Sequence, residues 1–214
     1  MNIVLLGAPG AGKGTQGELM ASHLNLKRLS TGDIFREILA DPSHKLYDEV
    51  KVVKEGKLVS DETVNEVVRY AIENSQAKGF IFDGYPRTLA QAKALDQMLA
   101  DMGKKIDAVV DLSVTKDVLM YRLLGRRICK KCKAVHHVSK GYEVCPDCGG
   151  ELYTREDDNE QTVLARFAEY EAKTAPLMDY YKAKDLNYVN ILVDNTQTTP
   201  KELDDIICAK LLNS

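Results

Sequence analysis

A glycine-rich segment near the N-terminus has the residue types that hold phosphate groups in proteins. Residues 7–15 read GAPGAGKGT and follow the apolar run from Ile3 to Leu6. Glycines let backbone N–H groups wrap around a phosphate, and a helix that begins there adds the positive end of its dipole. The ammonium of Lys13 would add a point charge at the terminal phosphates. Because a strand-like run precedes it, the segment is predicted to be a phosphate-binding loop rather than a glycine-rich turn.

The position after Lys13 departs from the usual phosphate-binding loop. Gly14 stands where a Ser or Thr commonly ligates Mg²⁺, and Thr15 follows it. We therefore expect water to complete more of the metal's coordination shell. Asp83 ends the apolar run 80–82 and is placed to orient a hydrated Mg²⁺. A cap at the end of a strand is the alternative role for this carboxylate.

Several arginines have the chemistry that phosphoryl transfer requires. The transferring group spreads negative charge over its equatorial oxygens, and fixed guanidinium groups stabilise that charge. The spacing of Arg122 and Arg126 would place both on one face of an expected helix over 115–127. A solvated surface charge is the alternative for any one arginine. The candidates are Arg87, Arg122, Arg126, Arg127, Arg155 and Arg166.

Four of the five cysteines form two Cys-x-x-Cys pairs separated by twelve residues, namely Cys129, Cys132, Cys145 and Cys148. This spacing is typical of a tetrahedral zinc site, with disulfides or iron as alternatives. Four thiolates leave no position for water, so the predicted Zn²⁺ is structural and replaces a core that so short a segment lacks. His136 and His137 lie between the pairs and are expected to be strand or surface residues rather than ligands. Cys208 is expected to be a buried apolar thiol.

The elements that must position these residues alternate along the chain. Strand-like apolar runs lie at 1–6, 79–83, 107–112 and 188–193, and helical spacing covers 16–24, 61–75, 88–102, 115–127, 159–186 and 200–212. The alternation indicates βαβ units and a parallel sheet covered on both faces. Thr31 and Asp61 are the expected N-caps of two helices. Residues 30–60 and 128–154 interrupt this alternation of strands and helices and are interpreted as insertions.

The composition excludes several classes of protein. The 214 residues carry 29 basic and 32 acidic side chains, a formal net charge of −3, which argues against a nucleic-acid surface. The apolar runs of five or six residues are far shorter than the roughly 20 that cross a bilayer. We therefore expect a cytoplasmic protein without nucleic-acid or membrane partners. A zinc-ribbon module that binds nucleic acid is the alternative from another class.

The motifs, in their order, resemble those of the long-form, zinc-binding bacterial adenylate kinases, within the nucleoside monophosphate kinase family. The resemblance rests on GAPGAGKGT at 7–15, STGD at 30–33, GKLVSDE at 56–62, DGYPRT at 83–88, GRR at 125–127 and REDDN at 155–159. It implies an α/β P-loop fold in three layers with a central parallel five-stranded sheet. It also implies a core of 1–29, 60–125 and 160–214, a helical AMP-binding insertion at 30–59 and a zinc-binding lid at 126–159.

The resemblance implies a monomeric phosphotransferase that converts ATP–Mg²⁺ and AMP reversibly to two ADP. It assigns ATP to Gly10, Ala11, Gly12, Lys13, Gly14, Thr15, Arg126, Val135, His136 and Gln197. It assigns AMP to Thr31, Arg36, Lys57, Leu58, Val59, Gly84, Tyr85, Pro86, Arg87, Gln91, Arg155 and Arg166. The implied catalytic residues are Lys13, Arg87, Arg122, Arg155 and Arg166, and Asp157 and Asp158 match acids of the lid hinge that orient arginines.

Two departures from the family pattern bear on specificity. Better-known zinc-bearing members have a longer stretch with a Phe-Asn-Pro-Pro segment between the cysteine pairs, whereas this chain has residues 134–142 and places His136 where Tyr is common. We therefore expect lid contacts to ATP that differ from theirs. Thr31 and Gln91 favour AMP as the acceptor, and a kinase for UMP or CMP is the alternative within the same fold.

Overall fold

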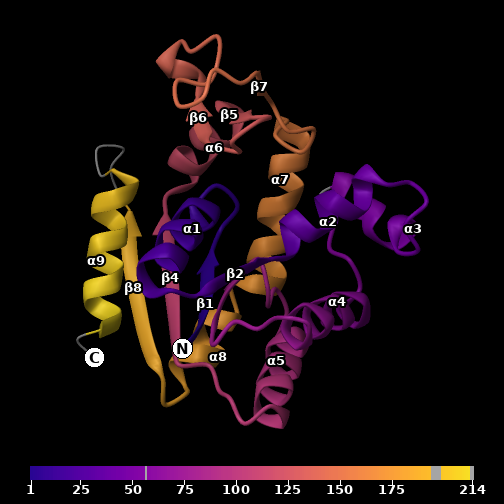
Figure 1. Ribbon diagram of the computed structural model, residues 1–214, viewed down its shortest axis with the longest axis vertical. Helices are drawn as coiled ribbons and strands as arrows, with labels where there is room; N and C mark the ends of the chain where they lie inside the picture. The colour runs from indigo at the N-terminus through magenta and orange to yellow at the C-terminus, as the bar shows by residue number, and fades with distance from the viewer. Residues whose placement is uncertain (56, 194–198, 213–214) are drawn as a thin grey trace.

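A parallel five-stranded sheet lies at the centre of the computed structural model, which describes residues 1–55, 57–193 and 199–212 (Figure 1). The strand order is β2-β3-β1-β4-β8, and every neighbouring pair is parallel. The strands are β1 (Asn2–Gly7), β2 (Lys27–Ser30), β3 (Phe80–Asp83), β4 (Ala108–Val114) and β8 (Asn187–Val193). Central strands buried on both faces explain the continuous apolar runs in the sequence. The predicted α/β class with a five-stranded parallel sheet is confirmed.

Helices cover both faces of this sheet, because alternate residues of each strand point to opposite sides. Val4 and Leu6 of β1 pack in one apolar cluster with α4, α5 and α8, whereas Ile3 and Leu5 pack in a second cluster with α1, α6 and α9. The helices are α1 (Lys13–Leu24), α2 (Thr31–Ala40), α3 (Tyr47–Val50), α4 (Asp61–Glu73), α5 (Leu89–Asp101), α6 (Lys116–Leu124), α7 (Glu160–Glu169), α8 (Leu177–Lys182) and α9 (Pro200–Leu212). None of those described has the length and apolar character to span a bilayer.

A second, antiparallel sheet stands apart from the first, at the top of Figure 1. Its strands are β5 (Arg126–Cys129), β6 (Val135–His137) and β7 (Leu152–Tyr153), in the order β6-β5-β7. On another side of the molecule, α2, α3 and the 3₁₀ turn η1 (Lys51–Glu55) form the segment after β2. The two interruptions of the βαβ rhythm thus correspond to two separate projections.

The helix caps differ from the expectation by one residue. The Oγ of Ser30 accepts a hydrogen bond from the backbone N–H of Asp33, and the Oγ of Ser60 accepts one from that of Thr63, each at 3.2 Å. The caps are therefore Ser30 and Ser60, and the predicted caps Thr31 and Asp61 are the first helical residues. A serine before the threonine or aspartate takes the extended backbone that a cap requires.

Two helices are shorter than the periodicity predicted, and the apolar pattern missed one strand of the parallel sheet as well as the short strands of the upper sheet. The helix expected over 115–127 ends at Leu124, and Arg126 begins β5, so Arg122 and Arg126 do not share a helix face. The helix expected over 159–186 is divided into α7, a π-helical turn (η3, Tyr170–Thr174) and α8, which starts after Pro176. The strand β2 has only two buried residues at the edge of the sheet, which gave no apolar run to detect.

Candidate active site

The glycine-rich loop joins β1 to α1 and requires glycine at several positions. Gly7, Gly10 and Gly12 have φ angles of +141°, +85° and +99°, which favour glycine. A Cβ on Gly7 would also lie 2.8 Å from the backbone oxygen of Leu112. No side chain among the described residues caps the N-terminus of α1. The loop and the first turn of α1 therefore offer their N–H groups to an anion.

Lys13 is held inside this loop by backbone oxygens. Its Nζ donates hydrogen bonds to the carbonyl oxygens of Gly7 at 2.6 Å and Ala8 at 3.1 Å. Burial lowers the pKa of Lys13 to about 8, against the charge of Asp83, which raises it. The positive charges of Arg87 and Arg166 lower this pKa further. A negatively charged ligand would therefore stabilise the ammonium form.

Arginines from distant parts of the chain meet in front of this loop. Burial lowers the pKa of Arg87 and of Arg155 to about 10 each, and neighbouring guanidinium groups add to both shifts. Burial also lowers the pKa of Arg166, with a contribution from the charge of Arg126. Among the described residues, burial alone lowers the pKa of Arg122, which lies on α6 outside this mutual group. Buried cations that repel one another are typical of a site that binds a polyanion.

Two aspartates orient part of this arginine group. The carboxylate of Asp158, whose side chain is fully buried, accepts hydrogen bonds from Nε and Nη2 of Arg126. Asp157 accepts one from Nη1 of Arg166 at 2.8 Å. The buried Nε of Arg155 has no hydrogen-bond partner among the described residues. Because an unsatisfied buried donor is costly, Arg155 is the arginine that a ligand would stabilise most directly.

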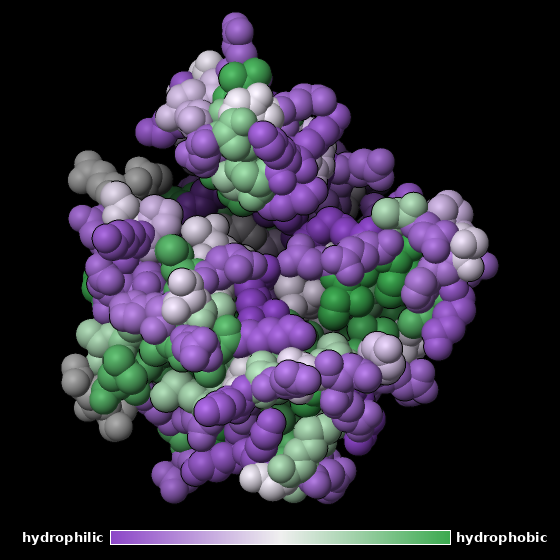
Figure 2. Space-filling model, viewed as in Figure 1, coloured by the Kyte–Doolittle hydropathy of each residue, from purple (hydrophilic) through white to green (hydrophobic). Residues whose placement is uncertain are grey.

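A pocket opens between α2, α4 and the end of β3. It is lined by Thr31, Phe35, Val53, Leu58, Val59, Val64, Gly84, Arg87 and Gln91. Six of these nine residues are sequence-predicted AMP contacts, so the fold brings half of the twelve predicted residues together around this pocket. Figure 2 shows the surface hollowed between the upper lobe, which carries β5–β7, and the right-hand lobe, which carries α2 and α3.

Hydrogen bonds fix the turn that floors this pocket. The hydroxyl of Thr31 and the Nε of Arg87 both donate to the carbonyl oxygen of Gly84 at 2.8 Å. Gly84 has a φ of +78°, and a Cβ there would lie 3.0 Å from both side chains. The Gln91 amide donates to Asp61 at 2.8 Å and accepts from the backbone N–H of Arg87 at 2.7 Å. These two contacts fix which end of the amide faces the pocket.

Other predicted nucleotide contacts lie elsewhere. The side chain of Lys57 is exposed and pairs with Glu55 at 2.7 Å, away from the pocket. Tyr85 is fully buried and precedes Pro86 through a cis peptide bond. In the upper lobe, Val135 is 51% exposed and His136 contacts the cysteine cluster. Gln197 lies outside the described residues.

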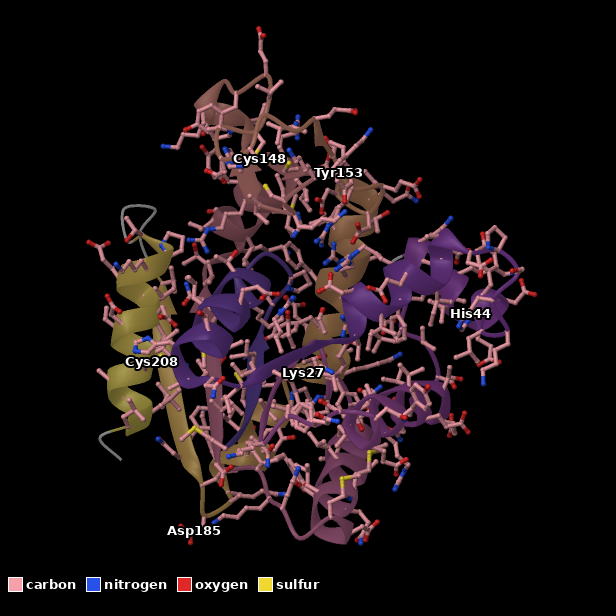
Figure 3. All side chains as sticks on the ribbon, in the orientation of Figure 1. Lys27, His44, Cys148, Tyr153, Asp185 and Cys208 are labelled. Atoms are coloured by element: carbon pink, nitrogen blue, oxygen red, sulfur yellow. The ribbon has the colours of Figure 1, made fainter. Side chains whose placement is uncertain are left out.

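The four paired cysteines converge in the upper lobe, where Figure 3 labels Cys148, whereas Cys208 lies far away on α9. The Sγ atoms of Cys129 and Cys148 are 3.5 Å apart, and those of Cys132 and Cys145 are 3.6 Å apart. All four lie within 4.8 Å of one another. Zinc–sulfur bonds of about 2.3 Å in a tetrahedron require sulfur separations near 3.8 Å. The spacing therefore fits a bound zinc and is too long for disulfides.

The backbone around the cluster also suits a metal-bound thiolate. The N–H of Cys132, with that of Lys131, donates to the Cys129 sulfur and lowers the pKa of this thiol to about 6. A Cβ on Gly150 would lie 2.7 Å from the same sulfur. His136 lies on a strand as expected, but its Nε2 is 3.3 Å from the Cys145 sulfur. The position of His136 between the cysteine pairs was the only signal for this contact in the sequence.

Sequence reasoning also missed three polar residues that support the site, Arg28, Asp33 and Asp61. Asp33 and Asp61 lie within the STGD and GKLVSDE motifs, but their spacing alone does not show which side chain they would hold. Arg28 lies on the strand that the apolar pattern did not reveal. A charged residue at the end of an edge strand ordinarily indicates only solvent exposure.

Comparisons with known proteins place this geometry in context. A family model described as adenylate kinase matches residues 5–186. A relative from Caldicellulosiruptor bescii named adenylate kinase is 45% identical over 208 residues, covering 95% of this chain and 97% of the relative. Relatives of the same name from Bacillus licheniformis and Archaeoglobus fulgidus are 45% and 43% identical, covering 86% and 88% of this chain and 87% and 89% of their own lengths.

Proposed function

Since the chain belongs to the adenylate kinase family, we propose that it transfers the γ-phosphoryl group of ATP reversibly to AMP, giving two ADP. One observation supports this function above all: Lys13, Arg87, Arg155 and Arg166 are all buried, and the charges of neighbouring guanidinium groups help to lower the pKa of each. Such a group needs a polyanion to be stable, and a pocket lined by six of the predicted AMP contacts opens near it.

We propose that the loop holds the phosphates of ATP. The backbone N–H groups of residues 10–15 surround the β- and γ-phosphates, and Lys13 exchanges its two carbonyl partners for phosphate oxygens. Arg126 is proposed to contact the nucleotide from the lid, held by Asp158. Val135 and His136 are less favourably placed, since His136 contacts Cys145.

The pocket beside α2 is proposed to hold AMP. Gln91 reads the adenine edge with the amide orientation that Asp61 fixes, and Arg36 and Arg87 bind the phosphate. Arg155 and Arg166, with Arg122 from α6, then stabilise the charge on the transferring group. Thr31, Leu58, Val59, Gly84, Tyr85 and Pro86 shape the pocket, and the backbone of Lys57 completes it.

Catalysis on this scheme is positioning and charge stabilisation. The two phosphates must lie in line, and no general base with an unusual pKa is required. Transfer to water is the competing reaction, and closure over both nucleotides would exclude it. We assign closure to residues 30–59 and 126–159, which project from a core of 1–29, 60–125 and 160–214.

The residues present fit two metals. Asp83 presents an oxygen, Oδ1, that accepts no hydrogen bond from the described residues, while Gly14 has no hydroxyl, so Mg²⁺ would be held through water and the phosphates. Bound Mg²⁺ would neutralise charge on the β- and γ-phosphates. Cys129, Cys132, Cys145 and Cys148 would hold a structural Zn²⁺ in a closed tetrahedral shell. We further propose that the enzyme is a cytoplasmic monomer.

A coupled assay tests the function. The purified protein is given ATP–Mg²⁺ with AMP, CMP, UMP or GMP, and diphosphate formation is measured. We expect AMP to be the preferred acceptor, because the pocket presents a fixed amide to the adenine edge. Equal or faster turnover of a pyrimidine monophosphate would contradict the assignment of AMP. Sedimentation equilibrium tests the monomer.

A further inference from the structure

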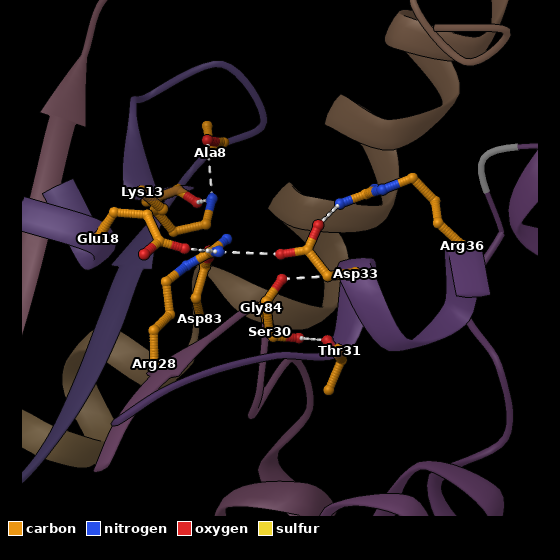
Figure 4. Close-up of polar contacts among 11 residues, drawn as sticks. Ala8, Lys13, Glu18, Arg28, Ser30, Thr31, Asp33, Arg36, Asp83 and Gly84 are labelled. Carbon is orange, nitrogen blue, oxygen red and sulfur yellow. Dashed lines mark hydrogen bonds and ion pairs between the residues drawn. The ribbon is translucent and has the colours of Figure 1, made fainter. Parts of the chain in front are cut away.

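Arg28 on β2 contacts three carboxylates at once, as Figure 4 shows. Its Nε and Nη2 donate to one oxygen, Oδ2, of Asp83 at 3.0 and 2.5 Å. Its Nη1 donates to Asp33 at 2.9 Å and to Glu18 at 2.7 Å. The side chain is only 14% exposed, and that of Asp83 is 9% exposed. The contact between Arg28 and Asp83 is therefore a shielded ion pair rather than a surface one.

The glycines of α1 make room for this arginine. A Cβ on Gly14 would lie 3.3 Å from Nη2 of Arg28, and one on Gly17 would lie 2.9 Å from its Cδ. The bare face of α1 thus lets the guanidinium extend across the helix to the end of β3. Gly14 is the loop position that lacks a metal-binding hydroxyl. Its missing side chain also leaves the space in which the Arg28 guanidinium packs.

The first consequence of this contact concerns Lys13. Asp83 lies close enough to Lys13 for its charge to oppose the fall in the lysine pKa, yet the ammonium donates to the carbonyl oxygens of Gly7 and Ala8. Arg28 occupies the Asp83 oxygen Oδ2 and offsets its charge. Without Arg28, the Asp83 charge would be left uncompensated within electrostatic reach of the ammonium that phosphate needs.

The second consequence concerns Arg36. One oxygen of Asp33 accepts from Arg28, and the other accepts from Nη2 of Arg36. Burial acts to raise the pKa of Asp33, but the hydrogen bond and charge of Arg36, with the charge of Arg28, lower it overall. An unbroken chain of ion pairs, from Asp83 through Arg28 and Asp33 to Arg36, therefore joins the two proposed nucleotide sites.

We propose that Arg28 is a positioning residue for both nucleotide sites: it keeps Asp83 away from Lys13, and it anchors Asp33, which holds Arg36 in position for a phosphate. This inference rests on the proposed function. Arg28 touches neither reacting group on this scheme and acts through its two aspartate partners.

The test measures binding rather than turnover. The dissociation constants for ATP and for AMP are determined by calorimetry, with and without Mg²⁺, for the full chain and for Arg28→Gln. We expect ATP binding without Mg²⁺ to weaken about tenfold, because Asp83 then pairs with Lys13. Mg²⁺ should reduce this loss of ATP affinity, because water bound to Mg²⁺ would compete with Lys13 for the freed Asp83 carboxylate. AMP binding should weaken about threefold in either condition.

Two further variants separate positioning from a general effect of charge. Arg28→Lys keeps one positive charge near Asp83 but has no fork to reach Asp33, so it should restore ATP binding and leave the AMP defect. Asp33→Asn should weaken AMP binding and spare ATP. Arg69→Gln is the control, since Arg69 is exposed on α4, lies 3.9 Å from Glu73 and belongs to neither proposed nucleotide site, and this variant should bind both nucleotides normally.

Two binding results would overturn the proposal. Normal binding of both nucleotides by Arg28→Gln would show that Arg28 positions nothing. Arg28→Gln could also lose equal ATP affinity with and without Mg²⁺, while Arg28→Lys binds both nucleotides normally. That result would show that Arg28 contributes only its net charge. Melting curves identify a variant that fails to fold, in which case Arg28→Lys and Asp33→Asn carry the test. If the unaltered chain binds neither nucleotide, the proposed function fails instead.

Discussion

At the scale of single residues, the site is built from buried cations that are unfavourable until a ligand binds. Lys13 and Arg155 show this most plainly, since one is buried against carbonyl oxygens and the other has a buried Nε without a partner among the described residues. Their burial costs folding free energy that a polyphosphate would return on binding. Stability and ligand affinity are therefore opposed at these positions.

Replacing Lys13 tests this opposition. Lys13→Met should reduce phosphoryl transfer by at least about 100-fold, because a fixed charge at the developing phosphate is lost. The variant should melt at an equal or higher temperature, because a buried cation is replaced by an apolar chain of similar length. The coupled assay and a circular dichroism melt measure the two effects. Transfer at the original rate would contradict the assignment of the loop.

The lowered pKa of Lys13 predicts proton uptake on ATP binding. A group with a pKa of about 8 is about three-quarters deprotonated at pH 8.5, and bound phosphate restores its higher pKa. ATP binding at pH 8.5 should therefore take up a fraction of a proton, whereas binding at pH 6.5 should take up far less at this residue. Calorimetry in buffers of different ionisation enthalpy measures the uptake, with Lys13→Met as the control. Equal uptake by both proteins would refute the prediction.

At the scale of elements, the sequence predicted β1, β3, β4 and the edge strand β8, whose buried and exposed residues alternate, and it missed β2. Long apolar runs specify β1, β3 and β4, but β2 presents only two buried residues at an edge. Helical periodicity likewise ran through the boundary between α6 and β5, because Leu124, Gly125 and Arg126 continue a plausible pattern. Boundaries depend on tertiary pairing, here of Arg126 with His137, which no local pattern contains.

The residues of the candidate site likewise fall into those that the sequence predicts and those that it does not. Motifs with fixed local geometry, such as the loop at 7–15 and the cysteine pairs, were predictable because their residues are close in the chain. The contacts of Arg28 with Asp83 and of His136 with Cys145 were not, because each depends on how two elements pack. Asp61 belongs to the same class, since it meets Gln91 across thirty positions.

The upper sheet should depend on its metal. Its strands β5, β6 and β7 are four, three and two residues long, too short to be stable alone. Removing the metal with a chelator should therefore lower a melting transition of this sheet while leaving that of the parallel sheet in place. Elemental analysis should find one zinc per chain, and scanning calorimetry follows the transitions. An unchanged thermogram after complete removal would show that the cluster contributes no stability.

At the scale of the whole molecule, a chain with a net charge of −3 concentrates its buried cations in one place. The two projections flank that place in Figures 1 and 2, one carrying the cysteine cluster and the other α2 and α3. Mutual repulsion of the arginines opposes their approach until anions neutralise them. Closure should therefore require phosphate from both nucleotides.

This coupling predicts a change of overall size. Small-angle X-ray scattering should give a smaller radius of gyration with ATP and AMP together than with either one, with a non-hydrolysable ATP analogue preventing turnover. ATP hydrolysis without AMP should be slow for the same reason, because the arginines do not converge on the phosphoryl group while the site stays open. Full compaction by ATP alone would show that the second phosphate is not needed.

The pairing of β5 with β7 has a consequence for how this family could vary. Ile128 and Cys129 lie directly beside Tyr153 and Leu152, so the chain leaves the upper sheet next to the point at which it enters. The segment between Cys129 and Leu152, cysteine cluster included, starts and ends at this ladder, and β6 and His137 add contacts with β5 and with Tyr121 of α6. A tight turn could bridge the same two strands, and the rest of the molecule would keep its register. The segment that carries the cysteine cluster could therefore change in length or content without moving either strand of this pair, and the core beneath it would keep its fold.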